Sequence, residues 1–191
     1  MLAELFSFLL DALVQPFAAV LLFRFHAAWL RAPMRNPIGE FLMALTDFIV
    51  LRARRYIPRV FGLDSATLLL AFVVEFIYLG AFLWLQGYAF DTFPLVGLLV
   101  WTAVKLLKIS IYLLMATLIA EAVLSWVNPH TPLAPMLLAV NRPFLQPLRR
   151  SIPPVGNVDL SVLILLLVCQ LILIVPIGGL EQGALKFLRL L

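Results

Sequence analysis

The same short basic element occurs twice in this chain, and each copy lies between two long apolar runs. Residues 46–64 and 141–159 share the pattern R-R-x-I-P-x-V-x-x-x-D, with 95 positions between equivalent residues. An internal duplication constrains the architecture, because each copy is expected to form one similar unit. We therefore predict two tandem repeats, residues 1–90 and 91–191.

The apolar runs predict an all-α integral membrane protein. Hydrophobic residues make up 64% of the chain and charged residues 13%, whereas a soluble domain has about 25% charged residues. About 20 helical residues cross the hydrocarbon core of a bilayer. The four expected spans are residues 9–29, 65–86, 109–126 and 160–174.

Two of these spans have unusual ends. The apolar run over residues 95–127 is too long for one upright span, so a tilted or kinked helix is expected there. Pro176 and the pair Gly178-Gly179 are expected to end the last span, because proline removes a backbone donor and glycine disfavours helix interiors.

An amphipathic segment is expected between the two spans of each repeat. In residues 31–64, apolar side chains recur at steps of three and four: Ile38, Phe41, Leu42, Leu45, Phe48 and Ile49. In residues 128–159 the corresponding set is Leu133, Met136, Leu137, Val140 and Phe144. This spacing is typical of one face of a helix. Such a helix either lies in the headgroup plane or packs on the transmembrane bundle, and the two interpretations are compatible.

The distribution of basic residues predicts the topology. Arginines are concentrated in the two segments between the spans of each repeat, and short loops rich in Lys and Arg face the cytoplasm. We expect an inner-membrane protein with both basic segments cytoplasmic and both termini external. The halves then share one orientation, as parallel repeats about an axis along the membrane normal. Because the basic residues cluster next to apolar segments, the net charge of +4 indicates anionic lipid headgroups and not nucleic acid as the partner.

With the Asn-Pro pairs that precede it (Asn36-Pro37 and Asn128-Pro129), the doubled pattern resembles the YggT family, also called YlmG. The second copy carries the family pattern at Asn141, Pro143, Pro147, Arg149, Arg150, Pro153, Gly156 and Asp159. The first copy departs from it, with Phe48 and Arg52 where prolines would be expected. The resemblance implies a small integral membrane protein without an established catalytic activity. It also implies links to osmotic-stress tolerance, to envelope and division functions, and in plastids to haem attachment.

Two sets of candidate site residues follow. Residues for contact with lipid headgroups or with a partner membrane protein are Arg54, Arg55, Pro58, Pro143, Pro147, Arg149, Arg150 and Pro153. The polar residues expected inside the membrane are Arg24, Glu75, Glu121 and Gln170, and an ionisable group in a span is a functional candidate. Arg24 paired with Glu75 or Glu121 would fix helix order; alternatively, the set lines a polar path for ions or protons.

The sequence contains little that favours an enzyme. His26 and His130 lack carboxylate or cysteine neighbours at metal-ligand spacing, and no phosphate-binding glycine loop is present. The lone Cys169 excludes an intramolecular disulfide. We predict no cofactor and no metal. The favoured function is a scaffold or assembly factor for other inner-membrane proteins, acting through another membrane protein or self-association. A small oligomeric channel or osmolyte-linked transporter is the alternative.

Overall fold

The computed structural model describes residues 2–60, 62–87, 95–152 and 159–189, and the elements in this part of the chain are helices. Four helices are long and apolar enough to cross a membrane: Glu4–Trp29, Ser65–Leu85, Leu95–Val127 and Leu160–Lys186. The predicted all-α membrane fold with four spans is therefore confirmed.

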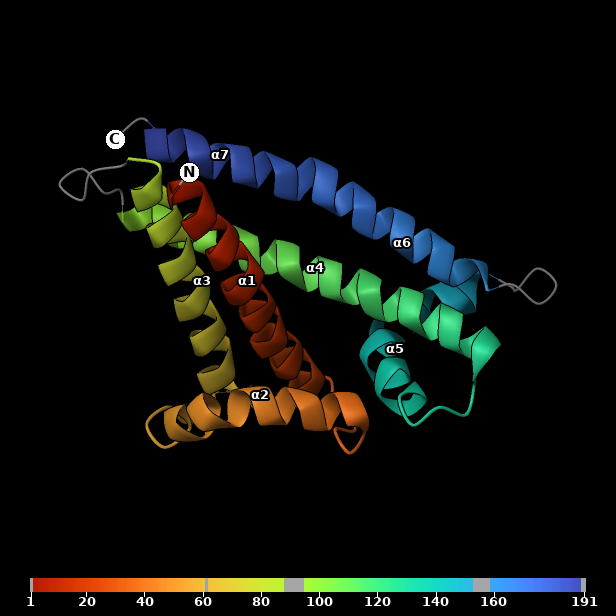
Figure 1. Cartoon of the computed structure of the whole chain (residues 1–191). Coiled ribbons are helices and arrows are strands. Elements are labelled where there is room, and N and C mark those ends of the chain that lie inside the picture. The colour runs from red at the N-terminus through yellow and green to blue at the C-terminus, as the bar shows by residue number, and fades with distance from the viewer. Residues whose placement is uncertain (1, 61, 88–94, 153–158, 190–191) are drawn as a thin grey trace.

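The first half of the chain has two long helices and a short helix that crosses their ends. Helices α1 (Leu2–Trp29) and α3 (Ser65–Leu85) pack side by side, and α2 (Pro37–Ala53) runs beneath both of them in Figure 1. Asn36 starts α2, because its side-chain oxygen accepts a hydrogen bond from the Gly39 backbone N–H at 2.9 Å. Position 39 must be glycine, since a Cβ there would lie 2.1 Å from the Met34 carbonyl oxygen.

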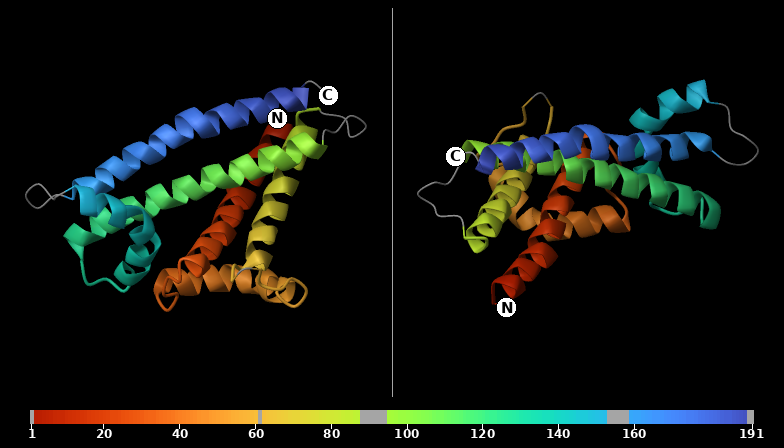
Figure 2. Two further views of the ribbon diagram at one scale, coloured as in Figure 1. Left: turned by 180° about the vertical axis from the view of Figure 1, so that it is seen from behind. Right: turned by 90° about the horizontal axis from the view of Figure 1, so that it is seen from above.

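The second half repeats the order of long, short and long helices. Its elements are α4 (Leu95–Val127), α5 (Ala134–Ser151), α6 (Leu160–Ile172), a π-helical turn η2 (Leu173–Ile177) and α7 (Gly178–Arg189). Helix α4 is a single continuous helix, inclined to α1 and α3, and the α6–α7 run lies along it (Figures 1 and 2). It packs against helices of both halves, α1 and α3 as well as α5, α6 and α7. Helix α4 therefore joins the two halves.

The expected end of the last span is wrong, because the helix continues past Pro176 into α7. A proline in an α-helix lacks the N–H group and clashes with the preceding turn. Here the backbone widens into a π-turn, in which the Gly178 N–H donates to the Leu173 carbonyl five residues back. The candidate span consequently extends to Lys186.

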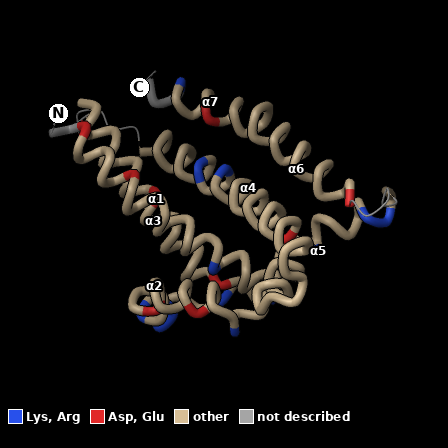
Figure 3. Tube along the Cα trace, turned by 45° about the vertical axis from the view of Figure 1, so that its right-hand side comes forward, with Lys and Arg blue, Asp and Glu red and all other residues tan. Residues whose placement is uncertain are grey.

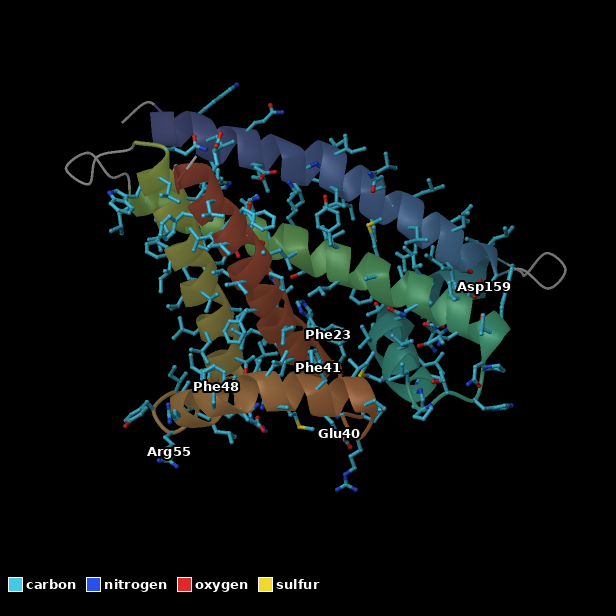
Figure 4. The ribbon with its side chains drawn as sticks, viewed as in Figure 1. Phe23, Glu40, Phe41, Phe48, Arg55 and Asp159 are labelled. Carbon is cyan, nitrogen blue, oxygen red and sulfur yellow. The ribbon has the colours of Figure 1, made fainter. Side chains whose placement is uncertain are left out.

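The buried face of α2 differs from the predicted apolar face. Its buried residues are Gly39, Leu42, Thr46 and Val50, whereas Ile38, Phe41, Leu45 and Phe48 of the predicted face are exposed. Figure 4 shows Phe41 and Phe48 on the side of α2 toward the spans, and Glu40 and Arg55 on the opposite side. Phe48 also stacks against Phe17 of α1, with ring centroids 6.2 Å apart.

Helix α5 buries Met136, Leu137, Val140, Asn141 and Leu145. Three of these belong to the predicted apolar face, but Phe144 of that face is exposed. The helix runs through both Pro143 and Pro147.

Candidate functional site

An arginine–aspartate ion pair closes the loop after the short helix in each half. Arg54 donates through Nε to Asp64 Oδ1 at 3.2 Å, and its terminal nitrogen binds the other carboxylate oxygen. In the second half, Arg149 Nε lies 2.7 Å from Asp159 Oδ2. The two pairs have the same spacing of ten residues. The first Arg and the final Asp of the repeated pattern therefore form an internal clamp.

Each aspartate of the clamp also accepts a hydrogen bond from the first turn of the helix that follows it, and Asp159 caps that helix through a backbone N–H. Asp64 accepts a hydrogen bond from the Thr67 hydroxyl, and Asp159 accepts one from the Ser161 backbone N–H at 3.0 Å. Burial alone would raise the pKa of Asp64, but the hydrogen bonds and charge of Arg54, together with Thr67, outweigh burial and lower that pKa. Burial likewise acts to raise the pKa of Asp159, and Arg149 and Ser161 lower it. Both carboxylates thus remain charged at mildly acidic pH.

The second arginine of each pair has a different environment. Arg55 and Arg150 are exposed, and neither forms an ion pair with any residue that the structure describes. The side chain of Arg55 points away from the spans in Figure 4. The predicted contact set is therefore divided: Arg54 and Arg149 form ion pairs within the chain, whereas Arg55 and Arg150 are exposed and form none with the described residues.

The prolines of the predicted contact set are mostly exposed. Pro143 and Pro147 lie on the exposed surface of α5. Pro58 is exposed too, and its carbonyl accepts a hydrogen bond from the Ser65 hydroxyl. Pro153 lies outside the described residues.

Arg24 contacts the short helix and neither of the glutamates predicted to pair with it. Its side chain is buried, donates a hydrogen bond to the Thr46 hydroxyl, and lies 2.7 Å from the Asp47 carboxylate. The predicted pairing of Arg24 with Glu75 or Glu121 is wrong, because α2 crosses the end of α1 and places Thr46 and Asp47 closer. Arg24 therefore attaches α2 to the first span.

Glu121 attaches the short helix α5 to α4 in the second half, as Arg24 attaches α2 to α1 in the first, but it carries the opposite charge. Its carboxylate accepts hydrogen bonds from Asn141 Nδ2 at 2.8 Å and from Arg149 at 3.2 Å. Asn141 is fully buried, and the Thr117 hydroxyl donates to its side-chain oxygen at 2.7 Å. Together with Asp159, these residues join α4, α5 and α6 in one polar network.

Glu75 is fully buried between α1 and α3. Gln15 donates to its Oε1 at 3.1 Å, and Oε2 has no hydrogen-bond partner among the described residues. One turn along the same interface, Tyr78 donates to Asp11. Gln170, which occupies the corresponding register in the second half, is exposed on α6 and shares none of these contacts.

A further charged cluster joins α4 to α7 and was not predicted from the sequence. Glu181 lies 2.6 Å from Lys108 Nζ and 3.5 Å from Lys105 Nζ. Figure 3 shows the basic positions in the middle of α4 and the acidic position of α7. The available signal was the spacing of three between the lysines, which places both on one helix face. Because the last span was expected to end at Pro176, Glu181 was not expected to lie beside α4.

Within the described residues, no three His, Cys, Asp or Glu side chains are grouped to hold a metal ion. His26, the one histidine inside a span, uses Nδ1 for a 2.7 Å contact with the Leu22 carbonyl of its own helix. The described polar residues are thus arranged for ion pairing between helices and for presenting exposed arginines.

Comparisons with known proteins agree with the repeated architecture. The CCB3/YggT family matches residues 3–85 and 100–180, two segments that fit a two-repeat form. The chain is 32% identical over 171 residues to Uncharacterized protein YggT of Escherichia coli K12, covering 87% of this chain and 86% of the relative. It is 30% identical over 175 residues to an uncharacterized protein of Pseudomonas aeruginosa, covering 91% and 88%. No solved structure matches the chain significantly. By fold, repeat and sequence, the chain belongs to the CCB3/YggT family of membrane proteins.

Proposed function

We propose that the protein is a non-enzymatic scaffold or assembly factor for other integral proteins of the inner membrane, in the service of envelope organisation, division or osmotic-stress tolerance. The observation that carries this proposal is the doubled arginine pair. In each half one arginine is fixed by an aspartate, and its neighbour is exposed without a partner among the described residues.

The clamp makes the exposed arginine a well-positioned donor. The ion pair of Arg54 with Asp64 restrains the backbone next to Arg55, and that of Arg149 with Asp159 restrains the backbone next to Arg150. A restrained guanidinium loses less conformational entropy when it binds a carboxylate, and its planar fork favours two parallel hydrogen bonds. Two such groups on one chain favour a partner that binds both, because the second contact becomes intramolecular.

The position of α2 supports an interfacial location for these groups. Phe41 and Phe48 lie on the side of the spans, and Glu40 and Arg55 lie on the other side (Figure 4). A helix with this division of aromatic and charged residues is suited to the boundary between acyl chains and headgroups. By the rule that basic loops remain inside, the exposed arginines would face the cytoplasm and both termini would lie outside.

Affinity purification in mild detergent, followed by mass spectrometry, tests the proposal. The variant R55A/R150A is expected to insert in the membrane and fold normally but to lose a partner that wild type retains at a stoichiometric level. The matched control is R35A/R59A, which removes two other exposed arginines and the same charge. If R55A/R150A retains the partner as well as the control does, these arginines are not the docking element.

A small oligomeric channel or osmolyte-linked transporter is the second candidate. It is favoured by Glu75 Oε2, which has no hydrogen-bond partner among the described residues. The buried Glu75 carboxylate bonded to Gln15, with the Tyr78–Asp11 pair one turn away, provides polar groups that an ion or proton could use. Four spans leave little room for an enclosed path, so transport would require an oligomer. Flux into proteoliposomes tests this function: folded E75Q with lost flux supports a path, and unchanged flux contradicts one through Glu75.

A further inference from the structure

We propose that a basic groove on α5 binds the phosphate of an anionic phospholipid. The groove has a volume of about 470 Å³ and is lined by Leu138, Arg142, Gln146, Arg149 and Arg150. Four of the five residues recur at steps of four, four and three, so they lie along one face of the helix. The volume is within the range of small-molecule sites, about 300–1,000 Å³.

The charges in the groove are complementary to a phosphate. Arg149 pairs with both Glu121 and Asp159, so these three side chains together carry one negative charge. Arg142 and Arg150 are exposed and form no ion pair within the described part of the chain. A guanidinium binds phosphate oxygens through two parallel hydrogen bonds, and the Gln146 amide supplies a further donor. With Arg142 and Arg150 the whole group carries a net charge of +1, and both of these arginines are exposed beside the ion-paired Arg149.

The rest of the groove fits a lipid better than a free anion. Leu138 lies at one end of the lining with its side chain 48% exposed, and it provides an apolar contact for the glycerol and first acyl carbons. Helix α5 follows the end of α4, where Trp126 is 78% exposed. Exposed tryptophans are typical of the membrane–water interface, where phospholipid phosphates lie.

The same site is absent from the first half, although the two halves share the repeated pattern. By the offset of 95 positions, Arg142 corresponds to Asp47 and Gln146 to Leu51. Asp47 is an acid that pairs with Arg24, and Leu51 has no polar donor in its side chain. Lipid binding is therefore a property of the second repeat and not a general effect of basic residues.

The proposal goes beyond the assembly function and can fail independently of it. The assembly function depends on Arg55 and Arg150, whereas the lipid site also requires Arg142 and Gln146. The variant R142A is therefore expected to lose the lipid and keep the protein partner.

Native mass spectrometry of the delipidated full-length protein, titrated with phosphatidylglycerol or phosphatidylcholine, tests the site. We expect wild type to prefer phosphatidylglycerol and R142A to bind it about tenfold more weakly, as loss of a charge-assisted contact implies. R142K is expected to recover only part of the affinity, because lysine cannot bind the phosphate bidentately. R35A removes the same charge outside the groove and is expected to bind as wild type does.

Three results would overturn the proposal: equal affinity for the two lipids, R142A binding phosphatidylglycerol like R35A, or glycerol phosphate competing as effectively as the intact lipid. The last result would show a site for a free anion in place of a phospholipid. R142K, which keeps the charge and most of the side chain, provides the comparison if R142A fails to fold.

Discussion

At the scale of single residues, the clamp aspartates carry two functions at once. Asp64 is almost fully buried, receives two hydrogen bonds from Arg54 and accepts a third from the Thr67 hydroxyl of α3. Asp159 makes the same kind of contact but remains 37% exposed. Because exposed ion pairs contribute little to stability, the first clamp is expected to stabilise its half more than the second.

The variant D64N is expected to lower the free energy of unfolding by about 2 kcal/mol, the typical worth of hydrogen bonds to a charged group. D159N is expected to cost about 0–1 kcal/mol. Unfolding in mixed micelles measures both values. If D64N loses less unfolding free energy than D159N, the more buried ion pair is not the more stabilising one, and the argument from burial is wrong.

The effect of pH follows from the lowered pKa of Asp64. A carboxyl whose pKa is lower in the folded than in the unfolded state stabilises the fold at pH values above its ordinary pKa, near 4. That contribution is lost as the pH falls through the folded pKa. The stability difference between wild type and D64N is therefore expected to be constant near pH 7 and to shrink below about pH 4.

At the scale of helices, the close approach of α2 to the preceding loop depends on Gly39. The variant G39A is expected to destabilise the protein by about 1–3 kcal/mol, because the new methyl group would overlap the Met34 carbonyl. G183A is the matched control, since a Cβ at position 183 meets nothing within 4 Å. Alanine there is expected to be neutral or to stabilise α7 by up to about 1 kcal/mol. If G39A and G183A lose the same thermal stability, the steric argument for Gly39 is wrong.

The charged cluster between α4 and α7 gives another prediction at this scale. E181M leaves Lys105 and Lys108 without their carboxylate and is expected to be strongly destabilised, by about 3 kcal/mol or more. The triple variant K105M/K108M/E181M removes all three charges and is expected to unfold near the wild-type denaturant concentration. A triple variant as unstable as E181M would show that the charges themselves are required.

Helix existence was predictable from the sequence, but helix ends and polar contacts were only partly so. Long apolar runs need about 20 residues to span a bilayer, and that length is readable directly. Pro176 was expected to stop a helix, yet one π-turn keeps the backbone hydrogen-bonded past it. Thr46 is not part of the predicted apolar face of α2, yet it is fully buried, and Arg24 hydrogen-bonds to its hydroxyl. Which side chains pair across two helices depends on the angle between the helices, and residue spacing along one helix does not determine that angle.

At the scale of the whole molecule, the two halves have the same order of elements but different partners for their ionisable residues. In the first half a buried arginine on α1 binds the short helix, and in the second half a glutamate on α4 does so. Helix α4 also packs on α1 and α3, so the halves form one structure around it. As a result, Arg142 forms no ion pair with the residues that the structure describes, whereas its counterpart Asp47 pairs with Arg24.

The distance in sequence between Lys108 and Glu181 has a consequence for biosynthesis. Glu181 is translated 73 residues after Lys108, which corresponds to roughly 4–15 s at 5–20 residues per second. During that interval α4 carries two ammonium groups whose carboxylate does not yet exist, whereas Arg24 and Asp47 of the first half are already synthesised. The first half can complete its ion pairs while the ribosome is still at work. The second half, in contrast, can complete the ion pairs between α4 and α7 only after its last helix has been synthesised.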